Sequence, residues 1–191
     1  MTELEIHAYA GDCLVDAHLE LPDGVRLTDY LNESTEVPLT QVRMTALDDG
    51  RIVEAENLLV STDEIHAVEA KDRGGQPGRR IRTRSSEVNV VVGPYRVQGY
   101  LHGPTAGDPL GALSRRQAMV PMTSAKIGFL VAGELRVKDC AALIVNRLHA
   151  NIEKPEGDAP SILDQIGLLP VDPNAKDLTG ELLIRRPPSD E

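Results

Sequence analysis

The sequence predicts a mainly β protein made of two tandem, pseudo-symmetric small β-barrels, each with one short helix, followed by a C-terminal tail. The first observation is a repeat, because VPLT at 37–40 returns as VPMT at 120–123. The second is an alternation of apolar and polar residues, which is typical of half-buried strands. The third is a series of turn signals, among them LPDG, DDG and VGP, that separate runs of strand length.

The repeat extends through most of both copies. At an offset of 82 residues, the first copy aligns with the second at Gly11, Val15, Leu19, Pro22 and Leu31, which match Gly93, Val97, Leu101, Pro104 and Leu113. The offset grows to 83 at VPLT and to 85 where LLVST at 58–62 meets LIVNR at 143–147. Because loops tolerate such insertions, we expect residues 4–69 and 88–153 to superpose.

Each copy has strand patterns and a single helical signal. In LVDAHLEL at 14–21 one side of a strand has Val15, Ala17, Leu19 and Leu21, and the other has Asp16, His18 and Glu20. The helical signal is TDYLNES at 28–34 in the first copy, with Thr28 as N-cap, and LGALSRRQ at 110–117 in the second. A domain of about 60 residues buries only about 60% of its surface. We therefore expect the copies to pack on each other, most simply through a C2-like interface.

Composition divides the chain into four parts. Residues 1–70 form the first barrel repeat and residues 87–154 the second, with a linker rich in Gly, Pro and Arg at 71–86. The tail at 155–191 contains a predicted short helix at 161–169. Such a helix needs a surface to lie on. It covers an end of its own barrels or, alternatively, serves as a recruitment peptide.

One segment of the first copy carries a recognisable signature, made by Arg26, Asp29, Tyr30, Leu31, Asn32, Pro38, Leu39 and Thr40. It resembles a family of short bacterial proteins that share an Arg-x-x-Asp-(Tyr/Phe)-Leu-Asn segment and a following Pro-Leu-Thr strand. The second copy keeps the Pro and Thr at 121 and 123 and ends in VNR at 145–147. The strand order is similar to that of Sm-like or SH3-like barrels. The resemblance covers about two thirds of the chain and implies a fold, with no activity attached.

The linker holds the candidate binding residues Arg79, Arg80, Arg82 and Arg84. They form a basic cluster in a chain whose formal net charge is −10. Guanidinium groups pair well with carboxylates and phosphates. One interpretation is a solvated linker, and the other is a site for an anionic ligand, since Arg80 and Arg84 have the Arg-x-x-x-Arg spacing of PilZ domains. The Asp/Asn-x-Ser-x-x-Gly motif of those domains does not follow in this sequence.

Charge and targeting signals narrow the class of protein. The net negative charge disfavours general binding to nucleic acids. The acidic start of the sequence lacks the positive charge of a signal peptide, and no apolar run is long enough to span a membrane. We therefore expect a cytoplasmic protein. Cys13 and Cys140 lack CxxC spacing and are expected to be reduced thiols.

The sequence contains none of the common catalytic fingerprints, such as Gly-x-Ser-x-Gly or His-Glu-x-x-His. We therefore expect no enzyme activity, no cofactor and no metal. The leading hypothesis is a scaffold or adaptor that binds another protein in a bacterial cytosol, with a homo-oligomer left open. The alternatives are a small-molecule (nucleotide) or RNA-binding module that uses the Arg-rich linker, and an unrecognised enzyme.

Overall fold

The structure is a computed structural model that describes residues 1–70, 83–104, 108, 110–155, 162–163 and 166. Residues 1–70, called the first half, contain β1 (Thr2–Ala10), β2 (Cys13–Leu21), α1 (Leu27–Glu33), β3 (Glu36–Ala46), β4 (Ile52–Ser61) and β5 (Ile65–Ala70). Residues 83–155, the second half, contain β6 (Thr83–Val92), β7 (Tyr95–Pro104), β8 (Met119–Val131), β9 (Glu134–Asn146) and β10 (Ala150–Glu153). Short 3-10 turns occupy Thr62–Glu64 and Leu113–Arg115.

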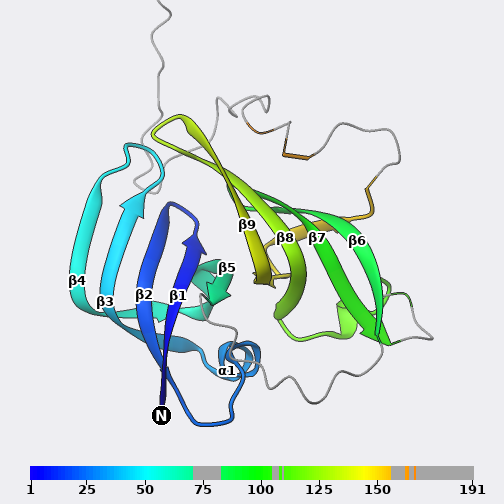
Figure 1. Ribbon diagram of the computed structural model, residues 1–191, viewed down its shortest axis with the longest axis horizontal. Coiled ribbons are helices and arrows are strands. Elements are labelled where there is room, and N and C mark those ends of the chain that lie inside the picture. Colours follow the sequence, from blue (N-terminus) through cyan, green and yellow to red (C-terminus); the bar gives the residue numbers. More distant parts are fainter. Residues whose placement is uncertain (71–82, 105–107, 109, 156–161, 164–165, 167–191) are drawn as a thin grey trace, which may run out of the picture.

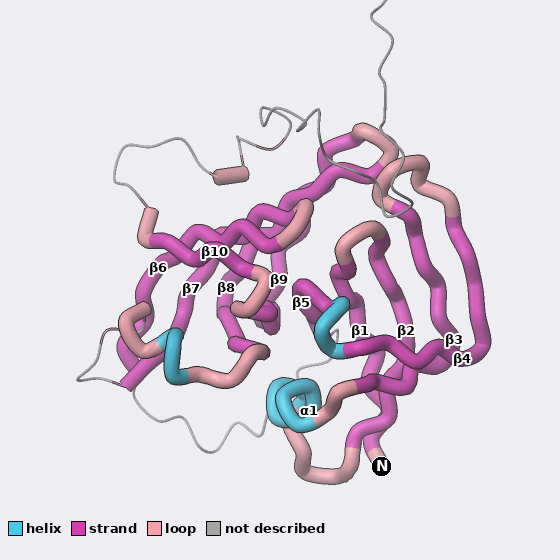
Figure 2. Tube along the Cα trace, turned by 180° about the vertical axis from the view of Figure 1, so that it is seen from behind, coloured by secondary structure: helices cyan, strands magenta, loops and turns pink. Residues whose placement is uncertain are grey.

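The ten strands form one antiparallel sheet in the order β10-β6-β7-β8-β9-β5-β1-β2-β3-β4 (Figure 1). This confirms the prediction of a mainly β protein. Among the described residues the pairing joins both halves in an open sheet and does not close either half separately. Each half nevertheless has the same internal order, with its fifth strand followed by its first, second, third and fourth. The tube in Figure 2 shows the two halves as two strongly curved groups of strands.

The register repeats between the halves as well. The pairing of β2 with β3 shifts between Asp16 and His18, and that of β7 with β8 shifts between Gln98 and Tyr100. Opposite each shift, the third strand has a non-glycine residue with positive φ, namely Gln41 (51°) and Ser124 (47°). A bulge bends the strand that carries it. The VPLT and VPMT segments therefore precede matching bends in β3 and β8.

The helical expectations need two corrections. The helix α1 begins at Leu27, with Arg26 as its N-cap, so Thr28 lies inside the first turn instead of capping it. In the second half, the predicted helix at 110–117 is reduced to the 3-10 turn Leu113–Arg115. Gly111 lies in that segment, and glycine disfavours helix by about 1 kcal/mol relative to alanine.

Alternating side chains of both halves form two apolar cores. The first-half core contains Val15, Ala17 and Leu19 from one face of β2, as the alternation predicts. The second-half core contains Val97 and Leu101 from β7. Val15 and Val97 are also aligned in the sequence repeat. These aligned positions of the second strands therefore have the same burial in the two cores.

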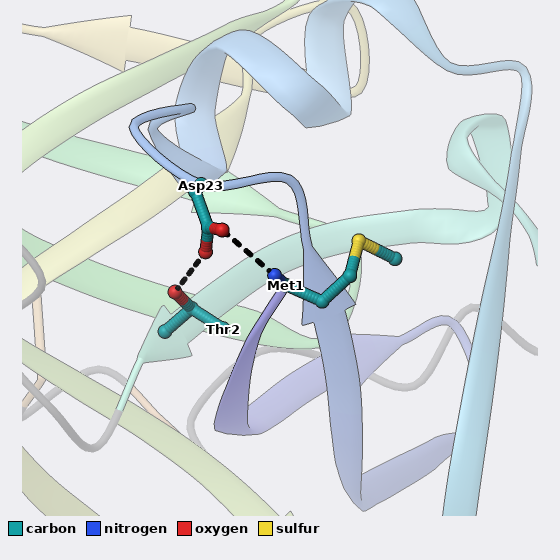
Figure 3. A network of polar contacts seen from close by, with 3 residues as sticks. All are labelled: Met1, Thr2 and Asp23. Carbon is teal, nitrogen blue, oxygen red and sulfur yellow. Dashed lines mark hydrogen bonds and ion pairs between the residues drawn. The ribbon is translucent and has the colours of Figure 1, made fainter.

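The first residues of the chain are held at the end of the β2 hairpin. The Met1 amino group lies 2.9 Å from one Asp23 carboxylate oxygen, and the Thr2 hydroxyl donates to the other at 3.1 Å (Figure 3). These bonds, with the amino group as the larger cause, hold the pKa of Asp23 below its ordinary value. All three side chains are exposed, so the contact orders the strand start without contributing to a core.

The predicted tail helix at 161–169 lies mostly outside the described residues. Within it, Ile162, Leu163 and Ile166 are described and lie in turns, and the Ile166 amide donates to the Leu163 carbonyl at 3.2 Å. In the part of the chain that the structure describes, no helix has the length and apolar character needed to cross a membrane.

Candidate functional site

The two halves meet where β5 of the first half pairs with β9 of the second. In this junction Ala67 lies opposite Val145, and Val68 lies opposite Ile144. The contact therefore joins the fifth strand of one half to the fourth strand of the other. A two-fold interface would repeat this contact as a pairing of β10 with β4, but these two strands lie at opposite ends of the sheet, so the expected C2-like arrangement is wrong. The observed contact is heterologous, or head-to-tail.

The junction is apolar because each half contributes side chains to the core of the other. Met119 and Ile144 of the second half belong to the first-half core. In the opposite direction, Tyr9, Leu14 and Ala67 of the first half belong to the second-half core. These residues are buried, and burial of each large apolar side chain is worth about 1.5–3 kcal/mol. The hydrophobic effect thus favours the joined arrangement.

An aromatic cluster fills the centre of the junction. The Tyr9 ring lies edge-on to Tyr95 and Phe129, with ring centroids 5.3 and 5.7 Å away. The Tyr95 hydroxyl donates to the Ala10 carbonyl at 2.6 Å, which ties β7 to the first half. Burial is the main cause that raises the pKa of both tyrosines far above the ordinary value, so both stay protonated.

A thiol and an ion pair lie beside these rings. The Cys140 thiol neighbours the Tyr9 hydroxyl and the Glu69 carboxyl group, and the Glu69 carboxylate pairs with the Lys138 ammonium group at 2.6 Å. Burial raises the pKa of Cys140 to about 12 and that of Cys13 to about 11. Both cysteines are reduced in the structure, as expected. Because thiolates are the reactive form, neither thiol is activated for chemistry at neutral pH.

The strand β4 is the counterpart of β9 in the first half, and its outer edge has no partner strand among the described residues. Leu59 pairs with Pro38 as Ile144 pairs with Pro121, so these two residues are equivalent. Ile144 is 8% exposed, whereas Leu59 is 59% exposed. An apolar edge that β5 covers in the second half is therefore open in the first half.

A recess adjoins this edge at the bend of β3. It has a volume of about 650 Å³ and is lined by Gln41, Val42, Arg43, Glu54, Ala55, Glu56 and Asn57. Ala55 lies opposite Val42, as Cys140 lies opposite Ala125 in the second half. Cys140 is buried against Tyr9 and Glu69 of the first half. The position of Ala55 is therefore open to a recess in the first half, whereas the equivalent Cys140 is buried in the second.

A second recess of about 400 Å³ separates α1 from the start of β8, and its walls include Asp29, Asn32 and Pro121 from the signature and its repeat. The Asn32 side chain donates to the Met119 carbonyl at 3.0 Å and accepts from the Met119 amide at 2.8 Å. The Asn32 side chain thus satisfies both backbone groups of Met119, as a residue on a neighbouring strand would. This contact gives the Asn of the signature a structural role at the junction.

Arg115 and Arg116 also line this second recess. The Arg147 Nε donates to the carbonyl groups of Arg116 at 2.9 Å and Gln117 at 3.0 Å, and the Arg116 guanidinium donates to the His102 carbonyl. Two of these three guanidinium groups are therefore used to fix the loop before β8. Arg115 is exposed.

Of the predicted binding arginines, the structure describes Arg84 alone. It is exposed and lies near the start of β6, opposite Gly103 of β7. Arg79, Arg80 and Arg82 lie outside the described residues. Thr83–Ser86, assigned to the linker by composition, already belong to β6.

Two histidines from different halves meet near the junction. His66 of β5 and His149, just before β10, have ring centroids 5.4 Å apart. Burial first, and the neighbouring His149 second, lower the pKa of His66. Among the described residues no three His, Cys, Asp or Glu side chains are grouped as a metal site would require. The lowered pKa means that the folded junction favours the neutral form of His66.

Sequence reasoning missed the β4 edge as a site. Nothing in LLVST differs in kind from LIVNR, because both are apolar runs. The distinguishing signal is the strand order, which reveals that one run has a neighbouring strand and the other does not. Comparisons with protein families, with curated proteins and with solved structures found no match to this chain.

Proposed function

We propose that the protein is a non-catalytic adaptor of the bacterial cytosol, made of two tandem, pseudo-symmetric Sm-like or SH3-like barrels, and that it binds a partner protein along β4. The observation that carries this proposal is the contrast between Leu59, which is 59% exposed, and its buried counterpart Ile144. An unpaired strand edge is a template for a strand of another chain. A partner would add an extended segment to β4, gaining main-chain hydrogen bonds and burying the apolar side chains.

The charges around the edge favour a particular partner. Glu54 and Glu56 lie on β4 beside the recess, and Glu36 begins β3 at the other end of the pairing. All three carboxylates are exposed. Complementary charge steers association and fixes register. An extended segment with apolar residues between basic ones fits this edge best.

The proposal is tested by capturing partners on the purified, immobilised chain and identifying them by quantitative mass spectrometry. The edge variant is Leu59→Lys, and the matched control is Leu148→Lys, at a position that is 61% exposed in the turn before β10. The partner is expected on wild type and control, and reduced about tenfold or more on Leu59→Lys, which corresponds to about 1.4 kcal/mol. Equal capture by all three proteins would refute binding at β4.

A further inference from the structure

Two residues of the tail, Leu163 and Ile166, lie on one face of the second half at Gly128 of β8. A Cβ added to Gly128 would lie 2.3 Å from the Ile166 Cδ1 and 3.0 Å from the Leu163 Cδ2. The missing side chain is thus what lets these two apolar residues lie on the strand. Arg96 of β7 lies opposite Gly128 in the sheet. Since residues directly opposite each other share a face, Arg96 belongs to the covered face.

The equivalent face of the first half has a different cover. Leu14 lies opposite Thr45 in the pairing of β2 with β3, as Arg96 lies opposite Gly128. Leu14 is buried and belongs to the second-half core. The hairpin between β8 and β9 also reaches this side, because the Ala132 amide donates to the Leu47 carbonyl at 2.8 Å. The next half of the chain therefore covers this face in the first half, and Leu163 and Ile166 cover it in the second.

We propose that Leu163 and Ile166 form an intramolecular cap that keeps the β4 edge of a second copy from adding to the second half. When the cap is displaced, β4 of another copy would pair with β10, in the way that β9 pairs with β5 within the chain. The second copy would then also cover the face that contains Arg96 and Gly128. In the register of the junction, Ile152 would lie opposite Leu59, and Asn151 opposite Val60. This inference rests on the proposed function in one respect, that β4 accepts a strand.

The sequence favours the capped state for wild type. In the second half, Arg96 and Asn151 stand at the positions that the apolar Leu14 and Ala67 occupy at the junction. A second copy that docked here would therefore bury less apolar surface than the two halves bury at their own junction. The cap, by contrast, is tethered to its site and acts at a high effective concentration. Wild type is therefore monomeric unless the cap is weakened.

Two independent sets of changes remove the cap. Arg96→Leu with Gly128→Thr gives the second half the residues of the first and takes the space of Ile166. Leu163→Asp with Ile166→Asp leaves the face unaltered and weakens the tail. We expect both variants to self-associate in sedimentation velocity at up to about 100 µM protein, with about a twofold or greater rise in mass. Adding Leu59→Lys should return each to monomer mass, whereas adding Leu148→Lys should not.

The register is tested by cross-linking. In the uncapped background, Leu59→Cys with Ile152→Cys should give disulfide-linked oligomers on oxidation, and Leu148→Cys with Ile152→Cys should not. If both uncapped variants stay monomeric, or associate regardless of Leu59→Lys, the cap is overturned. Partner capture by wild type at β4 would be unchanged in that case, so failure here is distinct from failure of the adaptor function.

Discussion

The strands β9 and β4 occupy the same place in the two halves, yet one is covered and the other is open. Both contain matching apolar residues, with Leu143 and Val145 in β9 corresponding to Leu58 and Val60 in β4. β5 lies against β9, and no described strand lies against the outer edge of β4. Composition made both strands suitable for burial. Head-to-tail pairing of the halves places β5 beside β9 and leaves β4 at the edge of the sheet.

The largest expected effect sharpens this contrast directly. Ile144→Ala should destabilise the protein by about 2–5 kcal/mol, because it leaves a cavity between two packed halves. Leu59→Ala should change stability by less than about 0.5 kcal/mol, because Leu59 is mostly solvated. The free energy of unfolding from urea denaturation measures both. Equal losses would mean that β4 is covered in solution.

The link between α1 and β8 is expected to come second. Asn32→Ala removes both hydrogen bonds to the Met119 backbone and should cost about 1–3 kcal/mol, since it leaves a partly buried amide and carbonyl unpaired. Asn151→Ala on the exposed strand β10 is the matched control and should cost less than about 0.5 kcal/mol. Thermal unfolding of the two variants makes the comparison. If both melt alike, Asn32 does not hold the halves together.

Two tyrosines of the junction should differ by a smaller amount. Tyr95→Phe leaves the Ala10 carbonyl without its 2.6 Å donor and should cost about 1–2 kcal/mol. The Tyr9 hydroxyl is buried and its described polar neighbour is the Cys140 thiol, a weak hydrogen-bonding group. Tyr9→Phe should therefore be within about 0.5 kcal/mol of wild type. A larger loss for Tyr9→Phe than for Tyr95→Phe would contradict the described contacts.

The junction should also respond to pH through His66. Its pKa is lowered in the folded protein, so the unfolded chain binds more protons between the folded value and the ordinary value of about 6.5. The His66 contribution to stability is therefore complete above about pH 6.5 and is lost as the pH falls through that window. Urea unfolding of wild type and His66→Asn at a series of pH values measures the difference. Parallel curves for the two proteins would rule out this contribution.

The smallest expected effect concerns the segment between the halves. Changing Arg79, Arg80, Arg82 and Arg84 together to Gln should leave thermal unfolding nearly unchanged if the cluster is a solvated linker, since solvated charges contribute about 0–1 kcal/mol each. If these residues contact an anionic partner, the variant should lose affinity and salt dependence. Titration of the captured partner at two salt concentrations tests this. Unaltered binding would identify the cluster as a solvated linker. The partner would then bind along β4 without help from these arginines.

Local patterns were sufficient to predict a mainly β protein and several of its strands. Alternation in LVDAHLEL identified the buried face of β2, and the position of VPLT and VPMT anticipated matching third strands. The bends at Gln41 and Ser124 have no signal in the sequence, because neither residue is the glycine that usually adopts positive φ. Aligning the repeat would have placed them at equivalent positions.

The sequence alone did not predict which distant strands pair with each other. A C2-like interface was the simplest expectation, but the choice between isologous and heterologous contact depends on which strand edges meet across more than 70 residues, as Val68 and Ile144 do. The signature residue Asn32 likewise acquires its role only through Met119, 87 positions away. No local period encodes such contacts, so neither the junction nor the open edge could be predicted.

Amide hydrogen exchange of residues 58–61 and 143–146 tests most directly the claim that β4 is the open counterpart of β9. Exchange measures local opening of hydrogen bonds, and both segments belong to the same fold. The account predicts slow exchange at 143–146, fast exchange of the outward amides at 58–61, and slowing of the latter when the partner binds. Equal protection of both segments in the isolated protein would contradict it.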